Sequence, residues 1–150
     1  MAFKVYPFTD NEKGATGFTH KAIISYANGD FTAAALTQTY TLYTLAANHL
    51  IRNSAIRVVT PVSGGAISAA SVTVGKTGTT NQYITATDVF TATVVKTKAG
   101  DGAGFNQAGG EGFGAASALV VVLTTTTGNV NAATAGEMHV FFSLADMTQF

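Results

Sequence analysis

The chain has 150 residues, a net charge of zero from eight basic and eight acidic residues, and neither cysteine nor tryptophan. Charged residues make up only 11% of it, against about 25% in an ordinary soluble domain. This composition excludes disulfides and thiolate metal sites, and it argues against electrostatic capture of nucleic acid, which needs a clustered basic face. We expect one domain with a charge-poor surface suited to packing against other protein.

The sequence indicates neither a membrane partner nor secretion. No apolar run approaches the roughly 18 residues that span a bilayer. The first ten residues, MAFKVYPFTD, lack the basic-then-apolar layout of a secretory signal. We therefore expect synthesis in a cytoplasm.

Residues 1–17 predict an N-terminal arm or a loose edge segment rather than a core element. They contain a proline, two glycines and a short polar run, which do not fit a central strand. Three aromatic residues in this segment, Phe3, Tyr6 and Phe8, are expected to be buried against protein. They either pack on their own domain or dock the arm on a neighbour.

The main domain is expected over 18–150, and its first strand over 18–26. Asn28 and Gly29 follow and form the strongest hairpin signal in the chain, because type I′ turns need positive φ at both central residues. This turn should link the first strand to a second strand over 31–45.

The second strand has an alternating pattern of threonine and larger residues. Thr37, Thr39 and Thr41 fall on one side of it and should face water or a partner. Helix is not expected here, because β-branched residues repeat at every second position.

Residues 55–95 contain three runs of β-branched residues cut by turn residues at short intervals, which is typical of antiparallel β-structure. The turn at 63–65 should fold the first run straight back on the second. The turn at 75–81 leads into a longer strand over 83–96, with a local turn at 87–88.

Residues 99–114 predict a long loop, because seven of these sixteen residues are glycine. Asp101, Asn106 and Glu111 in this loop raise the idea of a calcium site, but their spacing fits no established cation-binding loop. We interpret the segment as a plain flexible loop. Residues 119–123 are apolar on both faces, which predicts a central strand covered on both sides.

The last strand is expected over 138–144, where apolar and more polar residues alternate and Phe141 lies on the side away from the core. The whole pattern predicts an all-β fold. We expect an antiparallel β-sandwich or jelly roll of seven to eight strands with almost no helix.

No constellation indicates an enzyme, a cofactor or a metal. Residues 70–77 match a relaxed phosphate-binding loop, but such a loop must open a helix, and the residues after it are turn material. The three histidines lie on different expected elements with no ligand partner near them in sequence; they are His20, His49 and His139.

Four segments of the chain resemble small virion structural proteins of tailed bacteriophages. The segments are LAANHLIRNSAIRVVT (45–60), ISAASVTVG (67–75), YITATD (83–88) and TAGEMHVFF (134–142). Proteins of this kind are β-sandwiches that decorate the capsid or build head and tail accessories, commonly as trimers. The resemblance implies a capsid decoration, or cement, protein of the virion, made in the cytoplasm of a bacterial host. Its partners would be the major capsid protein and further copies of itself in a homotrimer.

The alternative function is an adhesin-like module of a tail or head fibre that binds a carbohydrate of the host surface. Sugar sites usually combine a stacking aromatic ring with several fixed polar groups, and here the tyrosines are scattered over separate strands. The candidate interface residues of the decoration protein are Phe3, Tyr6, Phe8, Thr37, Thr39, Thr41, Phe105, Phe113 and Phe141.

Overall fold

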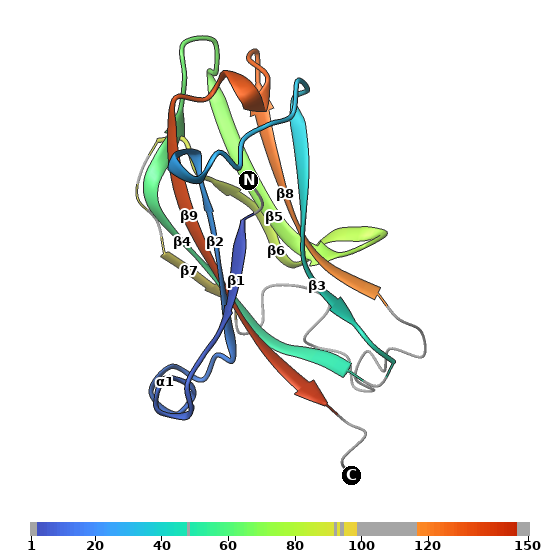
Figure 1. Cartoon of the computed structure of the whole chain (residues 1–150). Coiled ribbons are helices and arrows are strands. Elements are labelled where there is room, and N and C mark those ends of the chain that lie inside the picture. Colours follow the sequence, from blue (N-terminus) through green and yellow to red (C-terminus); the bar gives the residue numbers. More distant parts are fainter. Residues whose placement is uncertain (1–2, 48, 92, 94, 99–116, 147–150) are drawn as a thin grey trace.

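The computed structural model describes residues 3–47, 49–91, 93, 95–98 and 117–146 (Figure 1). The predicted glycine-rich loop at 99–114 therefore lies outside the described residues. The strands are β1 (Lys4–Pro7), β2 (His20–Ser25), β3 (Thr37–Leu45), β4 (His49–Ser63), β5 (Ala69–Lys76), β6 (Thr79–Asp88), β7 (Val95–Lys98), β8 (Ser117–Thr126) and β9 (Ala135–Asp146). A short helix, α1 (Asp10–Thr16), and two 3-10 turns, Tyr26–Asn28 and Val130–Ala132, complete the described elements.

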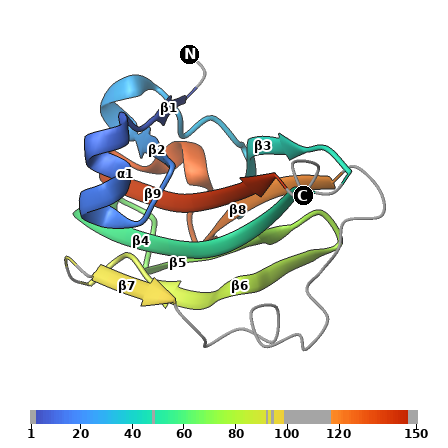
Figure 2. The ribbon, with the colours of Figure 1, turned by 90° about the horizontal axis from the view of Figure 1, so that it is seen from below.

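The strands form two antiparallel sheets packed face to face (Figures 1 and 2). The five-stranded sheet has the order β1-β2-β9-β4-β7, and the four-stranded sheet has the order β3-β8-β5-β6. The prediction of an antiparallel β-sandwich is confirmed. The order β2-β9-β4-β7 opposite β3-β8-β5-β6 is that of an eight-stranded jelly roll, to which β1 is added at one edge.

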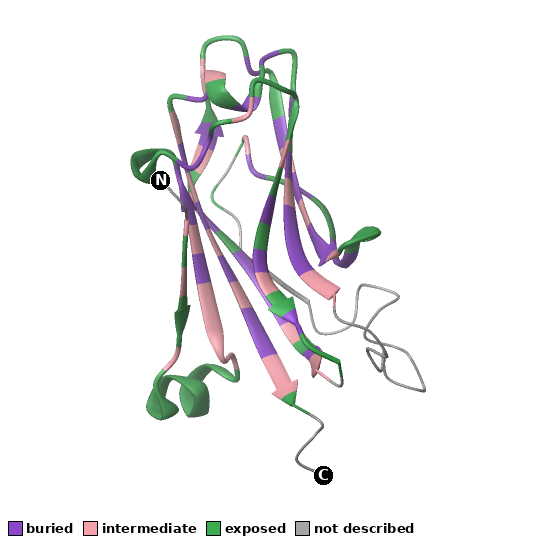
Figure 3. Cartoon of the chain, turned by 45° about the vertical axis from the view of Figure 1, so that its right-hand side comes forward, coloured by how far each residue is buried: buried purple, intermediate pink, exposed green. Residues whose placement is uncertain are grey.

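The core lies between the sheets, and buried residues alternate with more exposed ones along much of the long strands (Figure 3). Leu119, Val121 and Leu123 of β8 are completely buried. As its apolar run predicts, β8 is a central strand, between β3 and β5. The five-stranded sheet contributes fully buried residues from β2, β4 and β9; they include Ala22, Ile24, Ile56, Met138, Val140 and Phe142.

Two predicted hairpins are instead crossings between the sheets. The segment Tyr26–Asn28 is a 3-10 turn closed by Gly29 at φ 73°, and the chain then enters the other sheet. The turn at 63–65 likewise leads from β4 to β5, which pairs with β6 and β8. Turn residues thus mark where the chain reverses, but the strand that it meets is chosen by the packing of the two apolar faces.

The hairpin between β5 and β6 is confirmed. The chain reverses after Lys76 through Gly78, whose φ is 91°. No helix follows residues 70–77, so the pattern that imitates a phosphate-binding loop is part of a β-hairpin.

The helix α1 was not predicted. It begins with a capping box, in which the Glu12 amide donates to Thr9 Oγ1 at 3.4 Å and the Thr9 amide donates to Glu12 Oε2 at 2.9 Å. The Glu12 carboxylate accepts bonds from the Thr9 amide and, at 2.8 Å, from Thr9 Oγ1, and these two bonds lower the pKa of Glu12. Gly17 ends the helix in the left-handed conformation. Among the described residues, no helix has the length and hydrophobicity needed to cross a membrane.

Candidate functional site

The two sheets differ in the charge of their strands. In the four-stranded sheet the only charged strand residues are Lys76 and Asp88, and each is the last residue of its strand. The strands of the five-stranded sheet carry charges along their length; these are Lys4, Lys21, Arg52, Arg57, Lys96, Lys98, Glu137 and Asp146. Because the buried centre of a protein interface is depleted of charge, the outer side of the four-stranded sheet is the candidate docking surface.

Small side chains line up across this outer side. Their sequence neighbours Tyr40, Val72 and Leu123 are buried in the core, so these side chains point the opposite way. Two cross-strand rows of β3, β8 and β5 define what we call the threonine face: Thr37, Thr124 and Ser71 in one row, and Thr39, Val122 and Thr73 in the next. Thr37, Thr39 and Thr41 are all exposed, as the alternation predicts.

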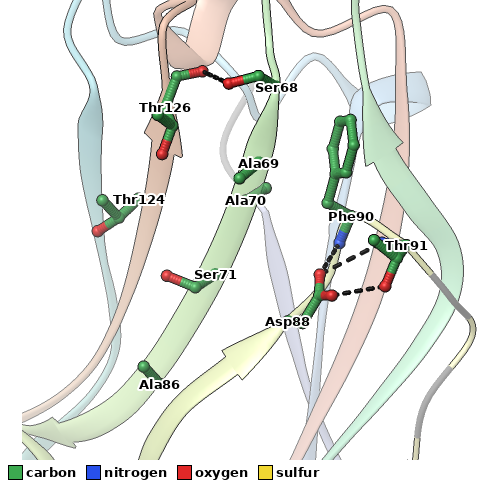
Figure 4. Close-up of a pocket in the computed structure, with 10 residues that line it drawn as sticks. All are labelled: Ser68, Ala69, Ala70, Ser71, Ala86, Asp88, Phe90, Thr91, Thr124 and Thr126. Carbon is green, nitrogen blue, oxygen red and sulfur yellow. Dashed lines mark hydrogen bonds between the residues drawn. The ribbon is translucent and has the colours of Figure 1, made fainter.

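A pocket of about 330 Å³ continues the threonine face where β6 ends (Figure 4). Its floor consists of small residues from the three neighbouring strands β5, β6 and β8. Because these side chains are short, the floor is recessed below the larger side chains of the wall. The end of β6 and the segment that follows it form its wall. The floor residues are Ala69, Ala70, Ser71, Ala86, Thr124 and Thr126, with Ser68 at one end; the wall residues are Asp88, Phe90 and Thr91.

The carboxylate of Asp88 organises the wall of this pocket. Its Oδ1 accepts bonds from the amides of Phe90 at 2.7 Å and Thr91 at 3.2 Å, and its Oδ2 accepts a bond from Thr91 Oγ1 at 2.5 Å. The Thr91 hydroxyl and the Phe90 amide hold the pKa of Asp88 below its usual value. The pocket therefore offers a fixed carboxylate, an aromatic ring and several hydroxyls, and no described residue that lines it is cationic. Such a lining suits a neutral hydroxylated ligand better than a phosphate.

A second pocket, of about 420 Å³, lies at the five-stranded sheet beside the end of α1. Its lining includes Arg52 and Asn53. The Asn53 Oδ1 atom is buried without a hydrogen-bond partner among the described residues. This pocket is more polar than the first, and Arg52, which is exposed, is the one charged residue among the described residues that line it.

The aromatic interface candidates that the structure describes lie away from the threonine face. Phe8 packs on Phe141 with ring centroids 6.2 Å apart, and Phe18 packs on Phe141 at 5.7 Å. This cluster lies on the outer side of the five-stranded sheet. Phe3 packs edge-to-face on Tyr40 at 5.6 Å.

Phe3 thus packs on its own domain, against a residue of the edge strand β3, and Phe8 is half-buried. Tyr6 remains 40% exposed, on the outer side of the sheet beside Lys21. Phe105 and Phe113 lie outside the described residues. The structure therefore places the described candidates on opposite sides of the sandwich.

The histidines lie on three strands, as expected, and each has a neighbour. His20 stacks on Phe142 at 5.1 Å, and burial, with the charge of Lys13, lowers its pKa. His49 Nε2 is 3.6 Å from an oxygen of Asp146. His139 Nε2 is 2.8 Å from an oxygen of Glu137, a pair that was missed in the sequence. Within the described ranges, no three potential ligand side chains come close enough to hold a metal ion.

The pocket residues were also missed. Asp88, Phe90 and Thr91 carried a usable signal, because an aspartate often accepts bonds from amides two and three residues later in a turn. The floor of the pocket had no such signal, since its residues come from three separate parts of the chain.

Comparison with known proteins adds no constraint on function. No protein-family model matches the chain, and no significant match was found among curated proteins or solved structures. The functional argument therefore depends on the fold, the distribution of charge and the pocket.

Proposed function

We propose that this protein is a structural protein of a tailed-phage virion that decorates the capsid by docking the threonine face on the major capsid protein. The observation that carries the proposal is a jelly-roll sandwich with one outer side free of charge at its centre. Jelly rolls are a common architecture of viral capsid domains. Because a fold alone does not assign a function, the charge-free side is the stronger part of the argument.

The threonine face suits burial against another protein. Charged groups lose hydration at an interface and stabilise it only when they are well paired, and Thr37, Thr39 and Thr73 avoid this cost. A threonine side chain offers a methyl group for packing and a hydroxyl group for a hydrogen bond. Beneath the face, Val72, Val121 and Leu123 are completely buried and hold the surface in place. A stable contact should bury about 1,200 Å² or more in total.

The proposal includes a homotrimer, which follows from the resemblance to phage virion proteins. A trimer matches the local three-fold positions of an icosahedral shell, and closed cyclic symmetry follows from repeated use of one interface. Light scattering of the purified protein at micromolar concentration tests it. A clean monomer would contradict a preassembled trimer.

Co-sedimentation with capsids of the same phage that lack this protein tests the decoration role directly. We expect the wild-type protein to pellet with the capsids and to saturate at a fixed copy number per shell. Absence of binding to such capsids would refute the decoration role and leave the fold unaffected.

We expect Thr73→Lys to weaken capsid binding at least tenfold, because it places a charge at the centre of the threonine face, where burial strips it of water. Thr60→Lys is the matched control, since Thr60 is an exposed threonine on a strand of the other sheet. Both affinities are measured by the same co-sedimentation titration. Equal binding by the two variants would show that another surface docks.

A second candidate function, the carbohydrate-binding module of a fibre, is favoured by one observation. The pocket combines the half-buried ring of Phe90 with the fixed carboxylate of Asp88 and a floor of small residues. Neutral sugars are recognised by such a pairing of an aromatic face with oriented polar groups.

This candidate predicts saturable binding of methyl glucoside or methyl galactoside in the millimolar range. Amide resonances of Ser71, Ala86 and Thr91 should shift in NMR titrations, and Phe90→Ala should abolish the shifts because the stacking ring is lost. Phe18→Ala is the control, as this half-buried ring lies outside the pocket. Shifts that survive in the Phe90 variant, or no shifts in the wild type, would rule the sugar site out.

A further inference from the structure

The edge strand β3 has an unpaired outer side in the described part of the chain. β3 is an edge of the four-stranded sheet (Figure 2), and β8 is its sole strand partner among the described residues. Within the same ranges, no loop contributes a backbone hydrogen bond to residues 37–45. An edge strand of this kind presents a row of backbone donors and acceptors that can pair with a further strand.

The other three edges carry features that discourage pairing, namely short length, lysine, proline, charge or bulges. β1 is four residues long and contains Lys4 and Pro7. β7 is also four residues long and contains two lysines. β6 ends with Asp88, and its pairing with β5 shifts register at two points.

β3 has few of these features. Its sequence, TQTYTLYTL, contains no charge, no proline and no glycine over nine residues. Its pairing with β8 has a single irregularity, between Thr41 and Tyr43, so Thr37 to Thr41 form a regular stretch. Leu36, directly before the strand, is 45% exposed. The edge is therefore long and uncharged, and Leu36 beside it is an exposed apolar side chain. Other described segments contact β3 through side chains, with Phe3 on the ring of Tyr40 and the amides of Thr32 and Ala33 bonded to Gln38 Oε1.

We propose that β3 pairs antiparallel with β3 of a second copy of this chain across a two-fold axis centred near Thr39. This register places Thr39 opposite itself and Thr37 opposite Thr41 of the second copy, and cross-strand threonine pairs stabilise a sheet. A second copy fits as the occupant because a two-fold contact uses the same surface twice. A charged residue on such an edge would lie close to the same charge of the second copy and repel it, and β3 contains no charged residue.

The pairing joins two four-stranded sheets into one continuous sheet and doubles the threonine face. It goes beyond the capsid-binding proposal and does not depend on it. It is also compatible with a trimer built through another surface, because three-fold and two-fold axes combine in closed assemblies. In every case the protein forms an even-numbered assembly in solution.

Light scattering tests this prediction with Thr39→Lys, which sets two positive charges opposite each other at the centre of the pairing. We expect the molar mass to fall to half the wild-type value, from dimer to monomer or from hexamer to trimer. Thr124→Lys is the control, since Thr124 lies on the same outer side but on the central strand β8, and it should leave the mass unchanged. A wild-type monomer or trimer, or an unchanged mass in Thr39→Lys, would overturn the proposal.

A cysteine variant gives an independent readout that does not require the pairing to be broken. The chain has no cysteine, so in Thr39→Cys a disulfide can form only between two copies. Residues opposite each other in an antiparallel pair have Cβ atoms about 4.5–5.5 Å apart, close to disulfide geometry. We expect rapid formation of a covalent dimer under mild oxidation and none with Thr124→Cys. No covalent dimer from Thr39→Cys, or from a double variant with cysteine at both 37 and 41, would exclude the contact, whether or not the protein binds capsids.

Discussion

Phe142→Ala is expected to lower the free energy of unfolding by about 3–5 kcal/mol, the usual cost of deleting a large aromatic side chain from a packed core. Phe142 is completely buried on β9, between β2 and β4. Its ring stacks on His20 at 5.1 Å and contacts Tyr43, a residue of the opposite sheet, at 6.2 Å. Alanine would leave a cavity that these two rings cannot close.

Phe141→Ala is the matched control for this prediction. It removes the same side chain from the next residue of the strand, which points to the outer side and is half-buried between Phe8 and Phe18. We expect a loss of about 1 kcal/mol, near the centre of the distribution for single substitutions. Urea denaturation of both variants measures the difference. Equal losses would mean that the two faces of β9 are not divided into core and surface as described.

The same pair of variants separates stability from docking. The threonine face belongs to the sheet opposite Phe142, and it depends on the core for its shape. Because Phe142 is not part of the threonine face, Phe142→Ala should reduce capsid binding only in proportion to the fraction of the protein that it unfolds. Phe141 lies on the other outer side, so Phe141→Ala should leave capsid binding unchanged if the threonine face is the docking surface.

The exposure of individual strands could be predicted from the sequence because side chains alternate along a strand with a period of two. Thr37, Thr39 and Thr41 are exposed, and Met138, Val140 and Phe142 are completely buried. Each of these assignments needs only the local pattern. The central place of β8 also follows from a local pattern, its apolar run on both faces.

The pairing of the strands could not be predicted in the same way. A turn such as Asn28-Gly29 fixes where the chain reverses, but β2 and β3 then enter different sheets. That choice depends on contacts between residues far apart in sequence, for example Ile24 with Met138 and Tyr40 with Val121. The helix α1 is a different case, since its capping box at Thr9 and Glu12 was present in the sequence within a run that looked merely polar.

The candidate site could be predicted only in part, because it is formed by several strands that become neighbours on folding. The sequence identifies a row of threonines on one strand, but it does not say which strands lie beside it. Once β3, β8 and β5 are neighbours, Thr39, Val122 and Thr73 become a continuous row. The pocket beside Phe90 also exists only after the strands have been brought together.

Gly136→Ala is expected to destabilise the protein by about 2–6 kcal/mol, because two costs of about 1–3 kcal/mol each coincide at this position. The backbone of Gly136 has φ 146°, a conformation that side-chain-bearing residues rarely adopt. A Cβ atom there would also lie 2.7 Å from Cε2 of Phe31 and 3.0 Å from Cγ2 of Val62. Both neighbours are buried, at 7% and 1% exposure, so neither can move aside freely.

Gly65→Ala is the control for this last prediction, since no heavy atom lies within 4 Å of the added Cβ. We expect its free energy of unfolding to stay within about 0.5 kcal/mol of the wild type, and urea denaturation measures both variants. A loss in Gly136→Ala no larger than in Gly65→Ala would contradict the close packing described here. Phe31 comes from the crossing between β2 and β3, and Val62 comes from the end of β4. A large loss would therefore establish that three segments distant in sequence meet at Gly136, where they close one end of the sandwich.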